Sequence, residues 1–87
     1  MPVTRKIVAD RLTAHLHSAL SLADLVDWAE RAAMDGEFEA GQEKLLLSVV
    51  ARIGVADVRA YGLPWEDCVS LLRQLGYEPS VSVQAAS

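Results

Sequence analysis

The feature that most constrains this 87-residue chain is a segment near its middle that is dense in apolar side chains. If residues 40–53 form a helix, its apolar residues cover well over half of the circumference at about 100° per residue. A strand is disfavoured by the length of the segment and by its polar lead-in at 42–44. A single packing helix cannot cover so wide an apolar surface. We therefore expect residues 40–53 to form the central helix of the fold. The apolar residues are Leu45, Leu46, Leu47, Val49, Val50 and Ile53.

Two amphipathic helices are expected before this segment. The first runs over residues 5–19 with Thr4 as its N-cap. The second runs from the N-cap Ser21 to residue 35, and Asp24 completes a variant of the capping box with a shorter acid. The apolar stripes consist of Val8, Leu12, Leu16 and Ala19 in the first helix, and of Leu22, Leu25, Val26, Ala29, Ala32 and Ala33 in the second.

A further helix is expected near the C-terminus, after a short helical turn at 55–61. It begins at Pro64, because proline is favoured at the first position of a helix. Glu66 and Asp67 follow in the first turn, where the helix dipole favours acids. The residues predicted for its core face are Trp65, Cys68, Leu71, Leu72 and Leu75.

Three glycines mark the expected helix ends. Gly36, Gly54 and Gly76 each follow an apolar periodic stretch, where a left-handed glycine commonly ends a helix. The sequence therefore predicts an all-α fold: a compact bundle of four main helices plus a short helical turn, with an extended C-terminal tail. We assign residues 1–79 to one helical domain and 80–87 to the tail.

The tail has the period of a strand in an otherwise helical chain. Tyr77, Val81 and Val83 alternate with Ser80, Ser82 and Gln84. Such a segment is mobile, docks as an added strand on another protein, or pairs with the same segment of a second chain. The last alternative predicts a homodimer through residues 77–84.

Composition excludes several protein classes. The hydrophobic fraction of 52% with 23% charged residues is typical of a globular protein. No apolar run approaches the roughly 20 residues that span a bilayer, and no secretory signal is evident, so we expect a cytoplasmic protein that does not bind membranes. The single cysteine, Cys68, fits a reducing compartment.

The sequence indicates no metal site or reactive thiol. His15 and His17 are two residues apart, so they lie on nearly opposite sides of a helix. We expect His15 at the boundary of the apolar stripe and His17 in solvent. Although a helix N-terminus lowers a thiol pKa, the adjacent Glu66 and Asp67 oppose ionisation of Cys68, which we therefore expect in the core.

The segment 35–39 superficially resembles a calcium-binding loop. With Gly36 at the sixth position of that motif, however, Arg31 occupies the first, where an acid belongs. A helix end followed by a solvated acidic loop is the better interpretation. Because no pair of carboxylates is marked as acid and base in a cleft, we expect no enzyme activity and no cofactor.

Charge is distributed unevenly along the chain, whose net charge is −4. Residues 21–43 contain seven acids and one base. Such a sector is often only a solvated helix face, but complementary charge also speeds association with a basic protein. Tryptophan and methionine beside it are enriched at interfaces. The candidate partner-binding residues are Asp24, Asp27, Trp28, Glu30, Met34, Asp35, Glu37 and Glu39.

The segment 55–75 has the layout of a helix-turn-helix. Its second helix opens with Glu66 and Asp67, which would meet phosphates, and the domain lacks a basic footprint. We therefore expect no nucleic-acid partner.

Three segments carry a resemblance: LVDWAE at 25–30, DGEFE at 35–39, and GVADVRAYGLPWEDC at 54–68. They look like a family of small uncharacterised bacterial helical proteins, and the similarity spans most of residues 5–83. The resemblance implies a stand-alone bacterial domain and carries over no site residue. In size and acidity the chain is also similar to bacterial immunity proteins and antitoxins, which block a basic toxin by docking.

The function that we expect is therefore a non-enzymatic protein–protein interaction module that uses an acidic helix and the loop after it. The alternatives are an immunity or antitoxin-type protein, a degenerate helix-turn-helix regulator, and an accessory subunit of an enzyme complex.

Overall fold

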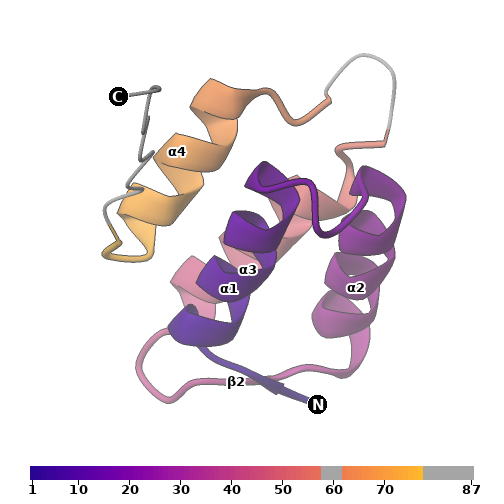
Figure 1. Ribbon diagram of the computed structural model, residues 1–87. Coiled ribbons are helices and arrows are strands. Elements are labelled where there is room, and N and C mark those ends of the chain that lie inside the picture. Colours follow the sequence, from indigo (N-terminus) through magenta and orange to yellow (C-terminus); the bar gives the residue numbers. More distant parts are fainter. Residues whose placement is uncertain (58–61, 78–87) are drawn as a thin grey trace.

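The computed structural model describes residues 1–57 and 62–77. These residues form four helices and two short strands, which confirms the all-α class (Figure 1). In chain order the elements are β1 (Pro2–Val3), α1 (Arg5–Leu16), α2 (Leu22–Asp35), β2 (Glu37–Phe38), α3 (Glu43–Gly54) and α4 (Trp65–Gln74).

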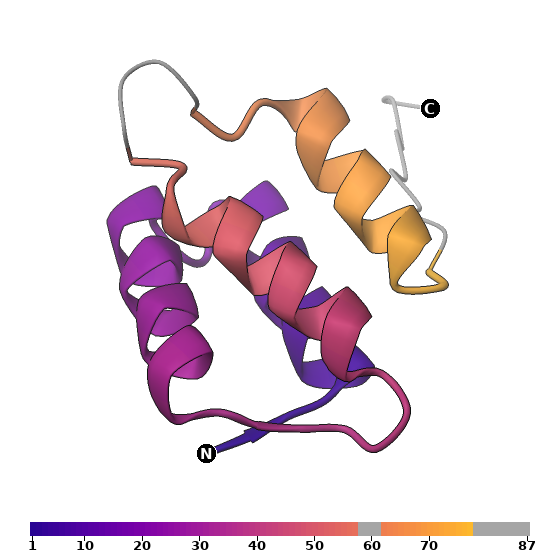
Figure 2. The same cartoon turned by 180° about the vertical axis from the view of Figure 1, so that it is seen from behind.

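Helix α3 buries one side in the core, as its sequence predicts, but it packs mainly against α2, and α1 is the helix that packs against each of the other three. Figure 2 shows α3 in front of α1, with α2 on one side and α4 on the other. The side chains of α3 that are completely buried are Leu46, Val49, Val50 and Ile53. The apolar surface is narrower than predicted, because Leu47 is 47% exposed. The helix also begins at Glu43 rather than at residue 40, since Gly41 has a φ of +81° and forms a turn.

Helix α1 begins as predicted and ends early. The Thr4 hydroxyl oxygen accepts a hydrogen bond from the backbone N–H of Ile7 at 3.1 Å, which confirms the N-cap. The helix was expected to reach residue 19 but ends at Leu16, because Ser18 takes a φ of 61° that a helix does not permit. Ala19 is consequently exposed and is not part of the apolar stripe.

Helix α2 has the predicted boundaries. The Ser21 hydroxyl accepts from the backbone N–H of Asp24 at 3.1 Å, which confirms the N-cap. The buried side of the helix is formed by Leu25, Val26, Ala29 and Ala32. Ala33 is exposed, so the predicted stripe is too wide by one residue.

All three predicted glycines lie at the end of a helix, but only one of them has the left-handed conformation that was expected. Gly76 has a φ of +90°, and the N–H groups of Gly76 and Tyr77 donate to the carbonyls of Arg73 and Leu72 at the end of α4. Gly54 is instead the last residue of α3, and Gly36 has an extended backbone with φ −73°.

Gly36 is required by space rather than by backbone conformation. A Cβ atom at this position would lie 2.3 Å from the carbonyl oxygen of Ala32 and 2.8 Å from Cγ2 of Val3. The contact with Ala32 lies at the end of α2, whereas the approach of Val3 arises from a two-stranded parallel sheet that no sequence pattern indicated. In this sheet β1 pairs with β2, with Pro2 opposite Glu37 and Val3 opposite Phe38. The solvated acidic loop expected at 35–39 is therefore partly a strand, and Val3 is completely buried beneath it.

Helix α4 begins at Trp65 with Pro64 as its N-cap, one residue later than predicted. Cys68, Leu71, Leu72 and Leu75 are buried as expected, whereas Trp65 is 45% exposed and does not belong to the core face.

Arg52 fixes the start of α4 to the end of α3. Its guanidinium donates to the carbonyl of Gly62 at 3.1 Å and to the carboxylate of Asp67 at 2.6 Å. Residues 55–57 form a turn in which the N–H of Ala56 donates to the carbonyl of Ile53. The rest of the short helical turn predicted at 55–61 lies outside the described residues. So do the 80–87 tail and nearly all of the pairing segment 77–84.

We predict that Val49→Asp unfolds the protein. An unpaired carboxylate at this completely buried site costs about 3 kcal/mol or more, against a total stability of about 5–10 kcal/mol for a small domain. The matched control, Leu47→Asp on the exposed side of the same helix, should cost less than about 1 kcal/mol. Thermal melting followed by circular dichroism compares the two variants. An unchanged melting temperature for Val49→Asp contradicts the burial of this side of α3 in the core.

A second prediction concerns Gly36. In Gly36→Ala the added methyl group collides with the backbone of α2 and with Val3, so we expect a loss of about 1–3 kcal/mol of stability in denaturant titration. Gly54→Ala is the control, because the nearest atom to its added Cβ is Glu30 Cγ at 3.8 Å. That change should be neutral or stabilising by up to about 1 kcal/mol. Equal effects of the two substitutions would refute the close packing at Gly36.

Candidate functional site

The outward side of α2 carries most of the predicted partner-binding residues. Leu25, Ala29 and Ala32 face the core, so the residues on the other side of the helix point to solvent. Met34 is 82% exposed, the highest value among the exposed large hydrophobic residues of the described chain. The carboxylates of Asp24, Asp27, Glu30 and Asp35 are exposed on the same helix, and that of Glu37 is exposed just after it.

One of these carboxylates is neutralised within the helix. Arg31 donates to the carboxylate of Asp27 as an i,i+4 ion pair, which confirms the pairing that the spacing favours. Both side chains are more than half exposed, so the pair contributes little to stability. Within the described part of the chain, Asp24, Glu30, Asp35 and Glu37 form no ion pair.

Trp28 lies at the edge of this surface. Its side chain is half-buried and packs against the core, so it is not an exposed anchor. The guanidinium carbon of Arg11 lies 5.4 Å from the centre of the indole ring. This cation–π contact links α1 to α2 and fixes the border of the acidic residues.

Glu39 has a different role from the one that the sequence suggested. Its carboxylate accepts a hydrogen bond from the backbone N–H of Arg5 at 3.0 Å, at the N-terminus of α1. The Arg5 side chain is 3.9 Å from the same oxygen. Glu39 thus accepts from a backbone N–H that has no partner within the helix. Its negative charge also interacts favourably with the positive end of the helix dipole. The two residues are 34 positions apart, and the sheet that brings them together gave no sequence signal.

We therefore restrict the candidate site to one continuous stretch, which we call the acidic α2 surface. It consists of Asp24, Asp27, Glu30, Met34, Asp35 and Glu37.

The histidines occupy the positions expected of them. The Nδ1 atom of His15 lies 3.0 Å from the carbonyl oxygen of Leu20, which only accepts, so this nitrogen carries the proton. His17 is exposed. In residues 1–57 and 62–77, no group of three or more His, Cys, Asp or Glu is placed to hold a metal ion.

Cys68 is completely buried in α4, as predicted. Burial raises the pKa of its thiol above the ordinary value of 9.0, and the neighbouring Asp67 carboxylate raises this pKa further, while Arg52 opposes the shift. The thiol therefore stays protonated and acts as a small core residue.

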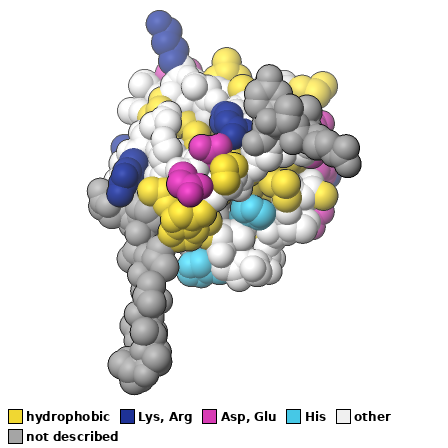
Figure 3. All heavy atoms as spheres, turned by 90° about the horizontal axis from the view of Figure 1, so that it is seen from above, with side chains coloured by type: hydrophobic (Ala, Val, Ile, Leu, Met, Phe, Trp, Pro, Cys, Tyr) yellow, Lys and Arg dark blue, Asp and Glu magenta, His cyan; other side chains and the backbone are white. Residues whose placement is uncertain are grey.

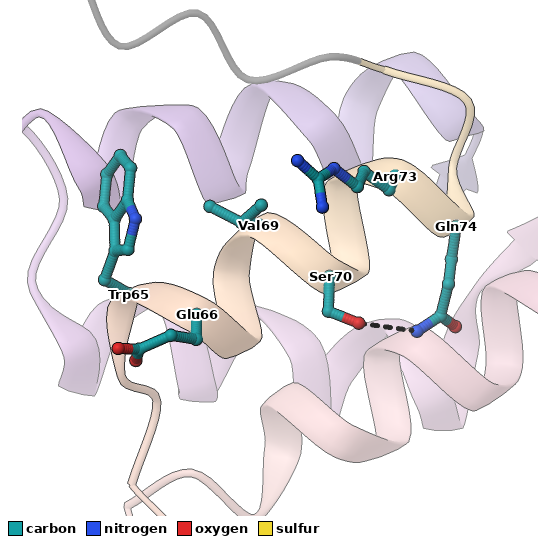
Figure 4. A pocket seen from close by; sticks show the side chains of 6 residues that line it. All are labelled: Trp65, Glu66, Val69, Ser70, Arg73 and Gln74. Carbon is teal, nitrogen blue, oxygen red and sulfur yellow. Dashed lines mark hydrogen bonds between the residues drawn. The ribbon is translucent and has the colours of Figure 1, made fainter.

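Two open hollows lie on α4, where no sequence pattern indicated a site. One has a volume of about 280 Å³ between α3 and α4 and includes the paired Arg52 and Asp67. The other has a volume of about 510 Å³ and is lined only by residues of α4 (Figure 4). Figure 3 views the end of the bundle where α4 begins and shows exposed hydrophobic side chains beside acidic groups and histidines.

Comparison with other proteins identifies no relative. No family model matches the chain, and searches of curated proteins and of solved structures gave no match either. In the part of the chain that the structure describes, no helix has the length and apolar character needed to cross a membrane.

The buried thiol predicts a specific pH dependence. Because the folded state raises the pKa of Cys68, it binds the proton more tightly than the unfolded chain does. This contribution to stability is present below the ordinary thiol pKa and is lost as the pH rises through the folded-state value. In denaturant titrations at pH 7 to 11, the wild type should lose more stability above about pH 9 than Cys68→Ala, in which other alkaline groups still titrate. Parallel losses in the two proteins would show that the thiol is not protected.

Proposed function

We propose that this chain is a non-enzymatic interaction module that binds a basic protein partner through the acidic α2 surface. The observation that carries the proposal is Met34, a large apolar side chain that is 82% exposed within a set of carboxylates. Methionine is enriched in the cores of protein interfaces, and its flexible thioether adapts to varied partner surfaces.

The helix geometry places acids around this methionine. Asp27 and Glu30 precede Met34 by seven and four residues, so the three residues share one side of α2. Side chains on a helix lean toward its N-terminus, which brings the Met34 side chain over the turn that holds Glu30 and Arg31. The complementary partner surface is an apolar pocket bordered by lysine or arginine side chains.

The net charge of this surface supports fast, salt-sensitive association. The surface contains five carboxylates, and the one guanidinium beside them is that of Arg31. Complementary charges mainly accelerate encounter and reject partners of like charge, while the buried apolar contact slows dissociation. In the complex, a partner cation competes with Arg31 for Asp27, because the existing pair is exposed and weak.

Among the more specific roles, an immunity or antitoxin-type protein fits this surface most directly, since it would neutralise a basic toxin in the bacterial cytoplasm. An accessory subunit of an enzyme complex would use the same contacts. A helix-turn-helix regulator is less well supported. Its recognition helix would be α4, whose first turn contains Glu66 and Asp67, and these acids would meet the phosphates of DNA.

Affinity capture from a native lysate with quantitative mass spectrometry tests the proposal. We compare the wild type with the triple variant Asp24→Asn, Glu30→Gln and Asp35→Asn, each change at an exposed site of the acidic α2 surface. A basic partner should be recovered with the wild type and reduced at least about tenfold with the variant, and capture should weaken as salt is raised.

The matched control is Asp10→Asn, Glu43→Gln and Asp57→Asn, which removes the same three charges at exposed sites outside this surface. It should retain the partner. If both triple variants capture the partner equally well, or both lose it equally, the acidic α2 surface is only a solvated helix face.

A further inference from the structure

The outward side of α4 forms a second surface, separate from the acidic α2 surface. The helix is attached to the core by Cys68, Leu71 and Leu72. On its opposite side Glu66, Ser70, Arg73 and Gln74 are exposed, and no other described element covers them. Trp65 is 45% exposed at the edge of this side.

Figure 4 shows how these side chains are arranged. Trp65, Val69 and Arg73 extend along one flank of the helix, and Ser70 and Gln74 lie along the other, with a hydrogen bond between them at 3.5 Å. The hollow that they line is open to solvent and comes from one helix alone. A surface of this shape accommodates another helix rather than an enclosed small molecule.

The charges on this side are arranged in a self-complementary way. Glu66 lies in the first turn and Arg73 in the last turn of α4. They are seven residues apart, so they share one side of the helix but are about 10 Å apart along its axis. They therefore do not pair with each other, and within residues 1–57 and 62–77 neither pairs with any other charged group.

We propose that the outward side of α4 pairs with the same side of α4 in a second copy of this chain, with the two helices antiparallel about a two-fold axis near Val69 and Ser70. In this arrangement Glu66 faces the partner's Arg73, and Arg73 faces the partner's Glu66. A two-fold interface requires such reciprocity, because each contact occurs twice.

The same geometry excludes a parallel pair, which would set Glu66 against the partner's Glu66. The small Ser70 side chain at the axis permits close approach of the two helices, and Val69 contributes an apolar contact beside it. Trp65 then lies next to the partner's Arg73. The apolar surface of its ring is buried there, and the ring can form a cation–π contact with the guanidinium. A small domain gains from this burial, since its own core is limited.

The interface is small, because α4 is about 15 Å long. We therefore expect a dimer that dissociates on dilution, with a Kd of about 1–100 µM, at the weak end of specific protein association. It leaves the acidic α2 surface, on a different helix, available to a partner.

Charge-swap variants of the full chain test the proposal by sedimentation equilibrium over a range of concentrations. Glu66→Arg and Arg73→Glu each place like charges opposite one another twice, so each should raise the dimer Kd by about tenfold or more. An equimolar mixture of the two variants should form a heterodimer, because one chain then carries two cations and the other two anions at these positions. The double variant Glu66→Arg, Arg73→Glu should dimerise again.

The double variant also separates this proposal from an effect on the helix alone. The helix dipole favours an acid in the first turn and a cation in the last, so a purely local role makes the double variant worse than either single variant. Glu43→Arg is the matched control, since it replaces a first-turn acid of α3 and should leave the dimer unchanged. Circular dichroism confirms that each variant is folded. A wild type that stays monomeric at millimolar concentration overturns the proposal, as does a dimer that the single variants do not weaken.

Discussion

The structure depends on the burial of one side of α3. Leu46, Val49, Val50 and Ile53 are completely removed from solvent, α2 packs along this helix, and α1 joins both of them to α4. Full burial of one such side chain contributes about 1.5–3 kcal/mol, so these four residues account for a large share of the favourable free energy in a small domain. Polar contacts then fix the periphery. Arg52 holds the start of α4, and Glu39 caps α1.

The parts of the fold that the sequence predicted are those set by local chemistry. The caps at Thr4 and Ser21, the burial of Cys68 and the left-handed Gly76 follow from neighbouring residues in the chain. The parts that it missed depend on contacts between distant segments. The β1–β2 sheet consists of two pairs of residues, too short for a recognisable strand pattern, yet it places Glu39 beside Arg5 and Val3 against Gly36.

The candidate site shows the same division. Exposure of Met34 and of the acids on α2 follows from helical periodicity, so the sequence indicated them correctly as surface residues. Trp28 was assigned to the same surface because it flanks the apolar stripe beside the acids, and Glu39 because it belongs to the same acidic stretch of the sequence. Their actual neighbours, Arg11 and Arg5, come from α1 and give both residues structural contacts. In α4, Trp65 looked like a core residue by spacing, but it is the first residue of the helix and nearly half of its side chain is exposed. Two outward helix sides, on α2 and α4, are thus supported by one common core.

Native-state hydrogen exchange, measured for individual backbone amides by NMR, tests the central claim that the fold depends on the buried side of α3. The amides of Val49, Val50 and Ile53 should exchange most slowly, with opening free energies equal to the global free energy of unfolding. Those of α4, which is attached on one side only, should exchange through smaller openings. If the α3 amides exchange as fast as those of α4 or faster, α3 is not the element on which the fold depends.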